Sequence, residues 1–222
     1  MKRLREQTIP PDRIIVWHDY GIEQVEVKIP GVECINSTND SWQSFPQMAM
    51  AWFANTDYVA ILDDDKPPGK KWFEHALKLE EQEKAIYGCF GYRIKNSQDL
   101  YRNLEYHETR NSKDDSVAEV DMVGQSYFFP AEYAKFFFME KPPFYRHTND
   151  LHLAYTCSKY GNVKGYVVYS LDPEERPECR EEELILDERQ HAEHHLDDHK
   201  SNRTEYVIWA VQNGWKLKWN KD

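Results

Sequence analysis

Short apolar runs alternate with longer amphipathic stretches through the first ninety residues. After their first residues, Arg13 and Asp57, the segments 13–17 and 57–62 are continuously apolar, which is the length and character of buried strands. Residues 45–55 and 69–84 instead repeat apolar side chains at helical spacing. Another apolar run follows at residues 85–90. This succession predicts an α/β fold whose mostly parallel, Rossmann-like central sheet is flanked by helices.

The remaining elements follow from turn residues and periodicity. A second strand is expected at 25–29 or at 32–35, and the helix at 45–55 should bury one stripe: Phe45, Met48, Ala49, Trp52 and Phe53. The middle of the chain predicts a small antiparallel addition, two extended segments joined by a polar hairpin tip at 108–116. Later elements are expected in this order: helix 131–138, helix 149–160, strand 165–170, an acidic surface loop at 172–183, and helix 202–213.

Composition limits the classes of protein that this chain fits. Its 222 residues suit one large domain spanning 1–222, and the formal net charge of -11 argues against non-specific nucleic-acid binding. No apolar run approaches the roughly 20 residues of a membrane helix. The basic N-terminus lacks the apolar stretch of a signal peptide. With four scattered cysteines as well, we expect a cytoplasmic protein with reduced thiols.

Three adjacent carboxylates, Asp63, Asp64 and Asp65, follow the apolar run at 57–62 directly. Ligands of open α/β sheets bind at the carboxyl ends of strands. Carboxylate oxygens are also preferred ligands of Mg²⁺ and Mn²⁺, which commonly bridge to phosphates. The triplet therefore predicts a metal–diphosphate site, and the alternative is a solvated acidic turn.

Three segments together resemble GT-A fold glycosyltransferases. They are Arg13 to Gly21, Tyr58 to Asp65, and Asp121 to Phe129. The sequence is most similar to the exostosin-like branch and to the small glycosyltransferase domains of chlorella viruses. The resemblance extends over roughly residues 5 to 215. It implies a GT-A-like domain that transfers a sugar from a nucleotide-diphosphate donor, in most members UDP-linked, to a saccharide or glycan acceptor.

The resemblance assigns the donor site by position. Asp65 corresponds to the direct ligand of Mn²⁺ or Mg²⁺, Asp63 to a ribose contact or a further metal ligand, and Asp64 to a residue facing the donor sugar. His18 and Asp19 correspond to the turn that contacts the uracil base, where the alternative is an Asx-type turn. Asn39 and Trp42 correspond to the wall of the nucleotide pocket, although Trp42 also suits a core position.

The second half of the chain supplies the expected catalytic groups. By resemblance, Asp150 faces the reaction centre as general base or as a stabiliser of an oxocarbenium-like state; otherwise it is a charge at a helix N-terminus. His199 and Arg203 are four residues apart, and so on one helical face. They resemble the family's basic pair near the diphosphate, with His199 as a third metal ligand or phosphate contact. A solvated helix face is the alternative for both. Residues 124–126 suit either an acceptor contact or a simple turn.

One departure from the family concerns the N-terminus. Most GT-A domains have a strand and a helix before the turn that corresponds to residues 7–11, whereas this chain starts inside that helix. The first strand of the fold is therefore expected to be absent. Two rival functions remain: a Mg²⁺-dependent nucleotidyltransferase or phosphohydrolase, and a non-catalytic glycan-binding or assembly module with a degenerate site.

Overall fold

The computed structural model describes residues 1–19, 29–37, 45–63, 66–98, 100, 104–178 and 198–219. Its helices are α1 (Lys2–Arg5), α2 (Phe45–Trp52), α3 (Trp72–Gln82), α4 (Ala134–Phe137), α5 (Asn149–Gly161) and α6 (His199–Gln212). Its strands are β1 (Ile14–His18), β2 (Val32–Asn36), β3 (Tyr58–Ile61), β4 (Ile86–Ile94), β5 (Leu104–Glu108), β6 (Val117–Val120), β7 (Met122–Pro130) and β8 (Gly165–Val168). Short 3₁₀ turns cover Thr109–Asn111, Ala131–Tyr133 and Pro173–Glu175.

The central sheet of the described chain is mixed. Its strand order is β3-β7-β4-β8-β6, and β5 pairs with β4 as well. Only β4 and β8 run parallel within it, while β3–β7, β4–β7, β4–β5 and β6–β8 are antiparallel. A separate two-stranded sheet pairs β1 with β2 in parallel. The α/β class with helices flanking a sheet is confirmed, but the mostly parallel sheet is not. Parallel pairing of consecutive strands needs a crossover connection of about a dozen residues or more, and the nine residues between β4 and β5 are too few for one.

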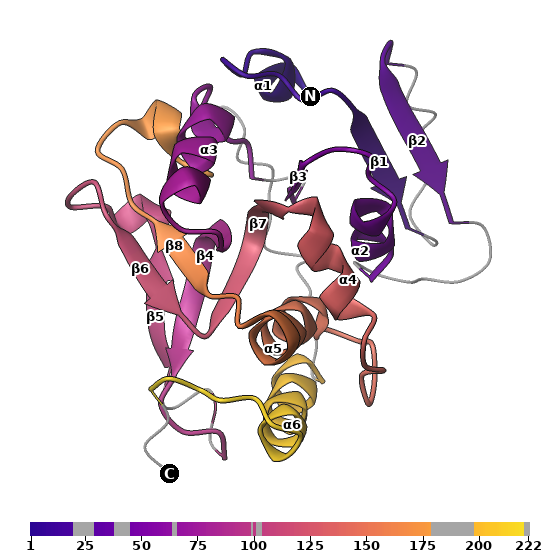
Figure 1. The fold of residues 1–222 in the computed structure, drawn as a ribbon, viewed down its shortest axis with the longest axis vertical. Coiled ribbons are helices and arrows are strands. Elements are labelled where there is room, and N and C mark those ends of the chain that lie inside the picture. The colour runs from indigo at the N-terminus through magenta and orange to yellow at the C-terminus, as the bar shows by residue number, and fades with distance from the viewer. Residues whose placement is uncertain are drawn as a thin grey trace.

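Alternate residues of β7 divide the core between the two faces of the sheet. Phe128 packs with Trp72 and Phe73 of α3 on one face. Tyr127 and Phe129 belong to the cluster that contains residues of α2, α4 and α5 on the other. Figure 1 shows α3 apart from the group formed by α4, α5 and α6, with β1 and β2 beyond α2. α6 then packs on α5 through a third cluster that includes Tyr155 and Tyr206.

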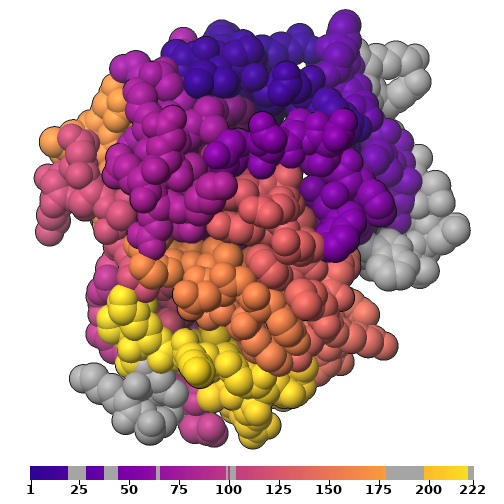
Figure 2. Space-filling view, in the orientation of Figure 1, coloured from indigo at the N-terminus to yellow at the C-terminus, as the bar shows by residue number. Residues whose placement is uncertain are grey.

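The two ends of the described chain lie at opposite ends of the molecule. In Figure 2 the N-terminal residues, in indigo, lie next to the purple surface of α3, while α6 and the C-terminal segment, in yellow, cover the end nearest α5. No helix in the described ranges combines the length and the apolar character needed to cross a bilayer.

Some expected elements were wrong. The polar stretch at 108–116 is not a hairpin tip, because β5 and β6 pair with different strands, β4 and β8. Within it Thr109 is fully buried and donates its hydroxyl to the Val168 carbonyl. The apolar stripe of α2 also ends early: Phe53 is 77% exposed, because the helix stops at Trp52. The helix expected at 131–138 divides into a 3₁₀ turn and the short α4.

Candidate functional site

Asp63 stands just beyond the end of β3, where the sequence predicts the acidic site. β3 pairs antiparallel with β7, and Ile61 lies opposite Tyr127. This pairing places the carboxyl end of β3 beside the middle of β7. The charge of Asp63 acts on two buried groups there, Tyr127 and Cys89. Asp64 and Asp65 lie outside the described residues.

Asp150 and Arg203, predicted separately, form a buried ion pair. Nη1 of Arg203 lies 2.8 Å from Oδ1 of Asp150, and Nη2 lies 2.8 Å from Oδ2. The side chains are only 8% and 14% exposed for Arg203 and Asp150. The backbone N–H of Leu151 also donates to Oδ1, at 2.7 Å. Asp150 is therefore both a first-turn carboxylate of α5 and one half of a bidentate contact between α5 and α6.

Two further groups hold the Arg203 guanidinium in place. It donates through Nη1 to the His147 carbonyl at 2.8 Å and through Nη2 to the Tyr92 hydroxyl at 2.6 Å. His147 has a positive φ of 63°, a left-handed backbone conformation that residues other than glycine rarely adopt. This turn directs the His147 carbonyl at Arg203 just before α5 begins. Arg203 therefore joins β4, the turn before α5, and α6.

Tyr127 lies among the charged groups of both regions. Burial raises the pKa of Tyr127 well above its ordinary value, and the nearby carboxylates of Asp150 and Asp63 raise it further, while Arg203 opposes them. Gly124, on the same strand, comes so close to Asp150 that a Cβ added there would lie 3.7 Å from Oδ2. β7 therefore contacts both regions: it pairs with β3, which ends at the acidic run, and its Gly124 lies beside Asp150 at the start of α5. The structure thus places Asp150, with its partner Arg203, beside β7, and Asp63 just beyond the end of the neighbouring strand β3.

A buried thiol lies beside the same part of β7. Cys89 Sγ is 3.7 Å from Oε1 of Gln125, a residue held at a positive φ of 67°. Burial raises the pKa of Cys89 to about 12. A thiol with that pKa stays protonated at neutral pH, which is the state of a buried structural cysteine.

Lys66, the first described residue after the acidic run, is buried in an ion pair with Glu178. Its Nζ lies 3.7 Å from Oε1 of Glu178, and both side chains are less than 10% exposed. Glu178 is also close enough to Cys89 for its charge to raise that pKa. A cation and a carboxylate therefore lie beside Asp63, at the same end of β3.

His199 lies at the start of α6, one turn before Arg203. Its ring centroid is 5.2 Å from that of His147. Nε2 of His147 lies 3.3 Å from Oδ1 of Asp198. His199 thus lies one helical turn from Arg203 and next to the His147 ring, and its role as a metal ligand or phosphate contact stays a prediction. Within the described ranges no three His, Cys, Asp or Glu side chains are grouped as a metal site.

Two of the residues expected to contact the nucleotide base lie at the end of β1: His18 is the last residue of the strand, and Asp19 comes next. Nδ1 of His18 is 3.2 Å from Oδ1 of Asn36 on the neighbouring strand β2. Asn39 and Trp42 lie outside the described residues. The expected grouping of these four residues around a nucleotide base stays a prediction.

Sequence reasoning missed three members of the site. Tyr92 lies outside the apolar run at 85–90, and Tyr127 suits a core position, because apolar strands give no signal for a hydroxyl near a charge. His147 contributes a backbone carbonyl, which no side-chain motif reveals. The signal that could have found Tyr92 is its position in β4, opposite Met122 and close to the residues 124–126 singled out on β7.

Comparisons with known proteins were made against family models and against curated sequences. No family model matches this chain, and no curated protein matches it significantly.

Proposed function

We propose that this chain is a metal-dependent glycosyltransferase with a GT-A-like fold, which moves a sugar from a nucleotide-diphosphate donor, UDP-linked in the simplest case, to a saccharide acceptor. One observation carries the proposal: Asp63 and Asp150, 87 residues apart in sequence, both border β7, Asp63 just beyond the end of the paired strand β3 and Asp150 beside Gly124. Charged groups from distant parts of a chain that meet in a partly buried place typify functional sites.

The role of Asp150 follows from its two bonds to Arg203. A bidentate guanidinium fixes the plane of a carboxylate, so that its remaining lone pairs point in defined directions. In an inverting reaction the carboxylate accepts the proton of the acceptor hydroxyl as general base; in a retaining reaction it stabilises positive charge on the sugar ring. The proposal covers both stereochemical courses.

The donor site combines Asp63 with residues 64 and 65. Asp63 offers the hard oxygen donors that Mn²⁺ and Mg²⁺ prefer, which fits the expected ion, and His199 offers a nitrogen from α6. When bound, such an ion offsets the charge that builds on the leaving diphosphate. Two buried cations belong to this proposed region: Lys66, which follows the acidic run and pairs with Glu178, and Arg203, which pairs with Asp150.

Thermal denaturation with UDP, with and without Mn²⁺, tests the proposal. A ligand that binds only the native state raises the free energy of unfolding, and with it the melting temperature. At a ligand concentration of a hundred times the dissociation constant, the stabilisation is about 2.7 kcal/mol. We expect a rise that requires both UDP and Mn²⁺. If neither component nor their combination changes the melting temperature, the transferase proposal is wrong.

A non-catalytic glycan-binding module is the second candidate, and one contact favours it. Both oxygens of Asp150 already accept hydrogen bonds from Arg203, so the carboxylate has fewer lone pairs left for a substrate hydroxyl. Such a module would bind saccharides without a nucleotide. Hydrolysis of UDP-sugars in the presence of Mn²⁺ separates the candidates, because only the enzyme releases UDP.

A further inference from the structure

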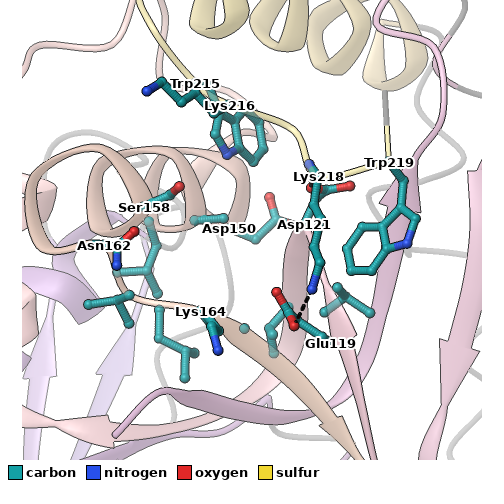
Figure 3. A pocket seen from close by; sticks show the side chains of 17 residues that line it. Glu119, Asp121, Asp150, Ser158, Asn162, Lys164, Trp215, Lys216, Lys218 and Trp219 are labelled. Carbon is teal, nitrogen blue, oxygen red and sulfur yellow. Dashed lines mark hydrogen bonds and ion pairs between the residues drawn. The ribbon is translucent and has the colours of Figure 1, made fainter. Parts of the chain in front are cut away.

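A cavity of about 190 Å³ opens between α5, the turn that joins β6 to β7, and the C-terminal segment. Figure 3 shows its labelled side chains, which come from these elements and also from β6 (Glu119) and the residues before β8 (Lys164). One stripe of α5 lines it, from Asp150 in the first turn through Ala154 and Ser158 to Asn162 at the C-cap. The cavity therefore runs along the same helix that begins at the candidate catalytic carboxylate. We call it the α5 groove.

The α5 groove carries no net formal charge. Three carboxylates, those of Glu119, Asp121 and Asp150, and three lysines, Lys164, Lys216 and Lys218, line it. Most of these charges are already engaged within the chain. Lys218 pairs with Glu119, as the dashed line in Figure 3 marks, and Lys164 pairs with Glu83 outside the groove. A groove with balanced and paired charges suits a neutral ligand better than an anion such as a phosphate.

Two polar side chains of α5 remain available to such a ligand. In the part of the chain that the structure describes, neither the Ser158 hydroxyl nor the Asn162 amide has a side-chain hydrogen-bond partner, and both line the groove. Hydroxyl and amide groups donate and accept, as does each sugar hydroxyl. They therefore match the hydrogen-bonding groups of a saccharide.

An aromatic surface completes the α5 groove. Trp219 is half-buried, and the Arg93 guanidinium lies 4.4 Å from its ring centroid, which holds the indole in place. A fixed indole offers a large apolar area at low entropic cost. The apolar C–H face of a sugar ring can pack on such a surface. The size of the cavity limits the occupant: 190 Å³ is below the roughly 300 to 1,000 Å³ of sites for drug-sized ligands, so one ring fits better than a nucleotide.

We infer that the α5 groove binds the terminal neutral sugar ring of a saccharide acceptor and presents it towards Asp150. The assignment of that sugar as an acceptor rests on the proposed function. Binding of the saccharide itself depends only on the groove. It requires neither a nucleotide nor a metal ion.

Titration of the ¹⁵N-labelled protein with lactose, cellobiose and maltose, without nucleotide or metal, tests the inference. We expect the indole N–H resonance of Trp219, identified by its loss in Trp219→Ala, to shift and saturate. Asn162→Gly removes the amide while keeping a residue that tolerates the left-handed conformation of this C-cap. It should weaken binding about fivefold, the worth of roughly one hydrogen bond. The exposed Ser201→Ala on α6 is the control and should bind as the unchanged chain does.

Two results would overturn the inference. The first is an unperturbed Trp219 resonance with all three saccharides. The second is a response to inorganic phosphate in place of the neutral sugars. The thermal test with UDP and Mn²⁺ is independent: saccharide binding without a UDP response supports the groove and rejects the transferase, and the converse rejects only the groove.

Discussion

Arg203 on α6 holds both carboxylate oxygens of Asp150 on α5 at 2.8 Å, across 53 residues of sequence. The pair is largely removed from water, and Arg203 makes two more hydrogen bonds, to Tyr92 and to the His147 carbonyl. A buried pair of this kind adds little net stability compared with apolar residues. Removal of one partner is costly, because the other charge is then left without compensation.

Arg203→Gln should therefore lower the free energy of unfolding by about 3 kcal/mol, at the lower end of the range for broken buried pairs. Urea denaturation measures this. Lys78→Gln, which breaks the exposed pair with Glu74 on α3, is the matched control and should leave the free energy of unfolding almost unchanged, because water screens an exposed pair. A double-mutant cycle with Asp150→Asn should show coupling between the two sites. Equal losses for Arg203→Gln and Lys78→Gln would contradict the buried pair.

Asp65→Ala should abolish the Mn²⁺-dependent response to UDP while the ligand-free melting temperature stays the same or rises. The reason is that loss of one of three adjacent carboxylates removes a proposed metal ligand and also relieves repulsion. Thermal denaturation with and without UDP and Mn²⁺ measures both effects. Full retention of the UDP response in Asp65→Ala would remove this residue from the metal site.

Asp150→Asn should keep UDP binding but lose sugar transfer, because the amide cannot accept a proton or stabilise positive charge as a carboxylate does. Rates of transfer under saturating donor, together with the UDP thermal response, separate the two properties. The neutral side chain also loses the ion pair with Arg203, so the folded fraction must be checked by circular dichroism. Unchanged turnover would show that Asp150 is not catalytic.

Glu80 should make stability depend on pH. The residue is 2% exposed, Oε2 has no hydrogen-bond partner among the described residues, and burial raises the pKa of the carboxyl to about 7 from 4.5. Below pH 4.5 the carboxyl is protonated in both states. Between pH 4.5 and 7 the folded state holds more protons than the unfolded one, so stability falls as pH rises through this window.

Glu80→Gln should remove that dependence, because the amide stays neutral. Compared with the unchanged chain, the variant should gain up to about 3 kcal/mol at pH 8 and differ little at pH 4. Urea denaturation at both values measures the difference. Asp121, whose pKa burial raises to about 6, should keep its own similar dependence between pH 3.8 and 6 in both proteins. A variant that is less stable than the unchanged chain at pH 8 would contradict the argument.

Gly69→Ala should detach the Pro173–Glu175 turn from the start of α3. A Cβ at this position would lie 2.4 Å from the Glu174 carbonyl oxygen, a backbone atom that cannot rotate away. We expect a loss of about 1 to 3 kcal/mol, as for other overpacked sites. The Lys71 amide, which donates to that carbonyl at 2.7 Å, should exchange its hydrogen faster. Unchanged exchange at Lys71 would show that the turn accommodates the methyl group.

The sequence predicted the individual elements of the site better than their arrangement. The strand before Asp63, the helix that begins near Asp150 and the helix that carries Arg203 are local patterns, and all three are present. Which strands pair depends on contacts between residues far apart in the chain, so the expected hairpin at 108–116 was wrong. The direct pairing of Asp150 with Arg203 was missed for the same reason. Periodicity places a residue on a helix face but does not say which helix that face meets.

The long sequence separations in this region have a consequence for how the molecule matures. Arg203 reaches back 53 residues to Asp150 and 111 residues to Tyr92. Contacts between such distant residues form late in folding, because the chain loses the entropy of closing a large loop before these contacts can stabilise it. During synthesis α6 can dock only after the residues up to Arg203 have left the ribosome, so no truncated fragment ending before residue 203 can assemble these contacts. Ligand affinity in this protein should therefore appear only after α6 has docked and the fold is complete.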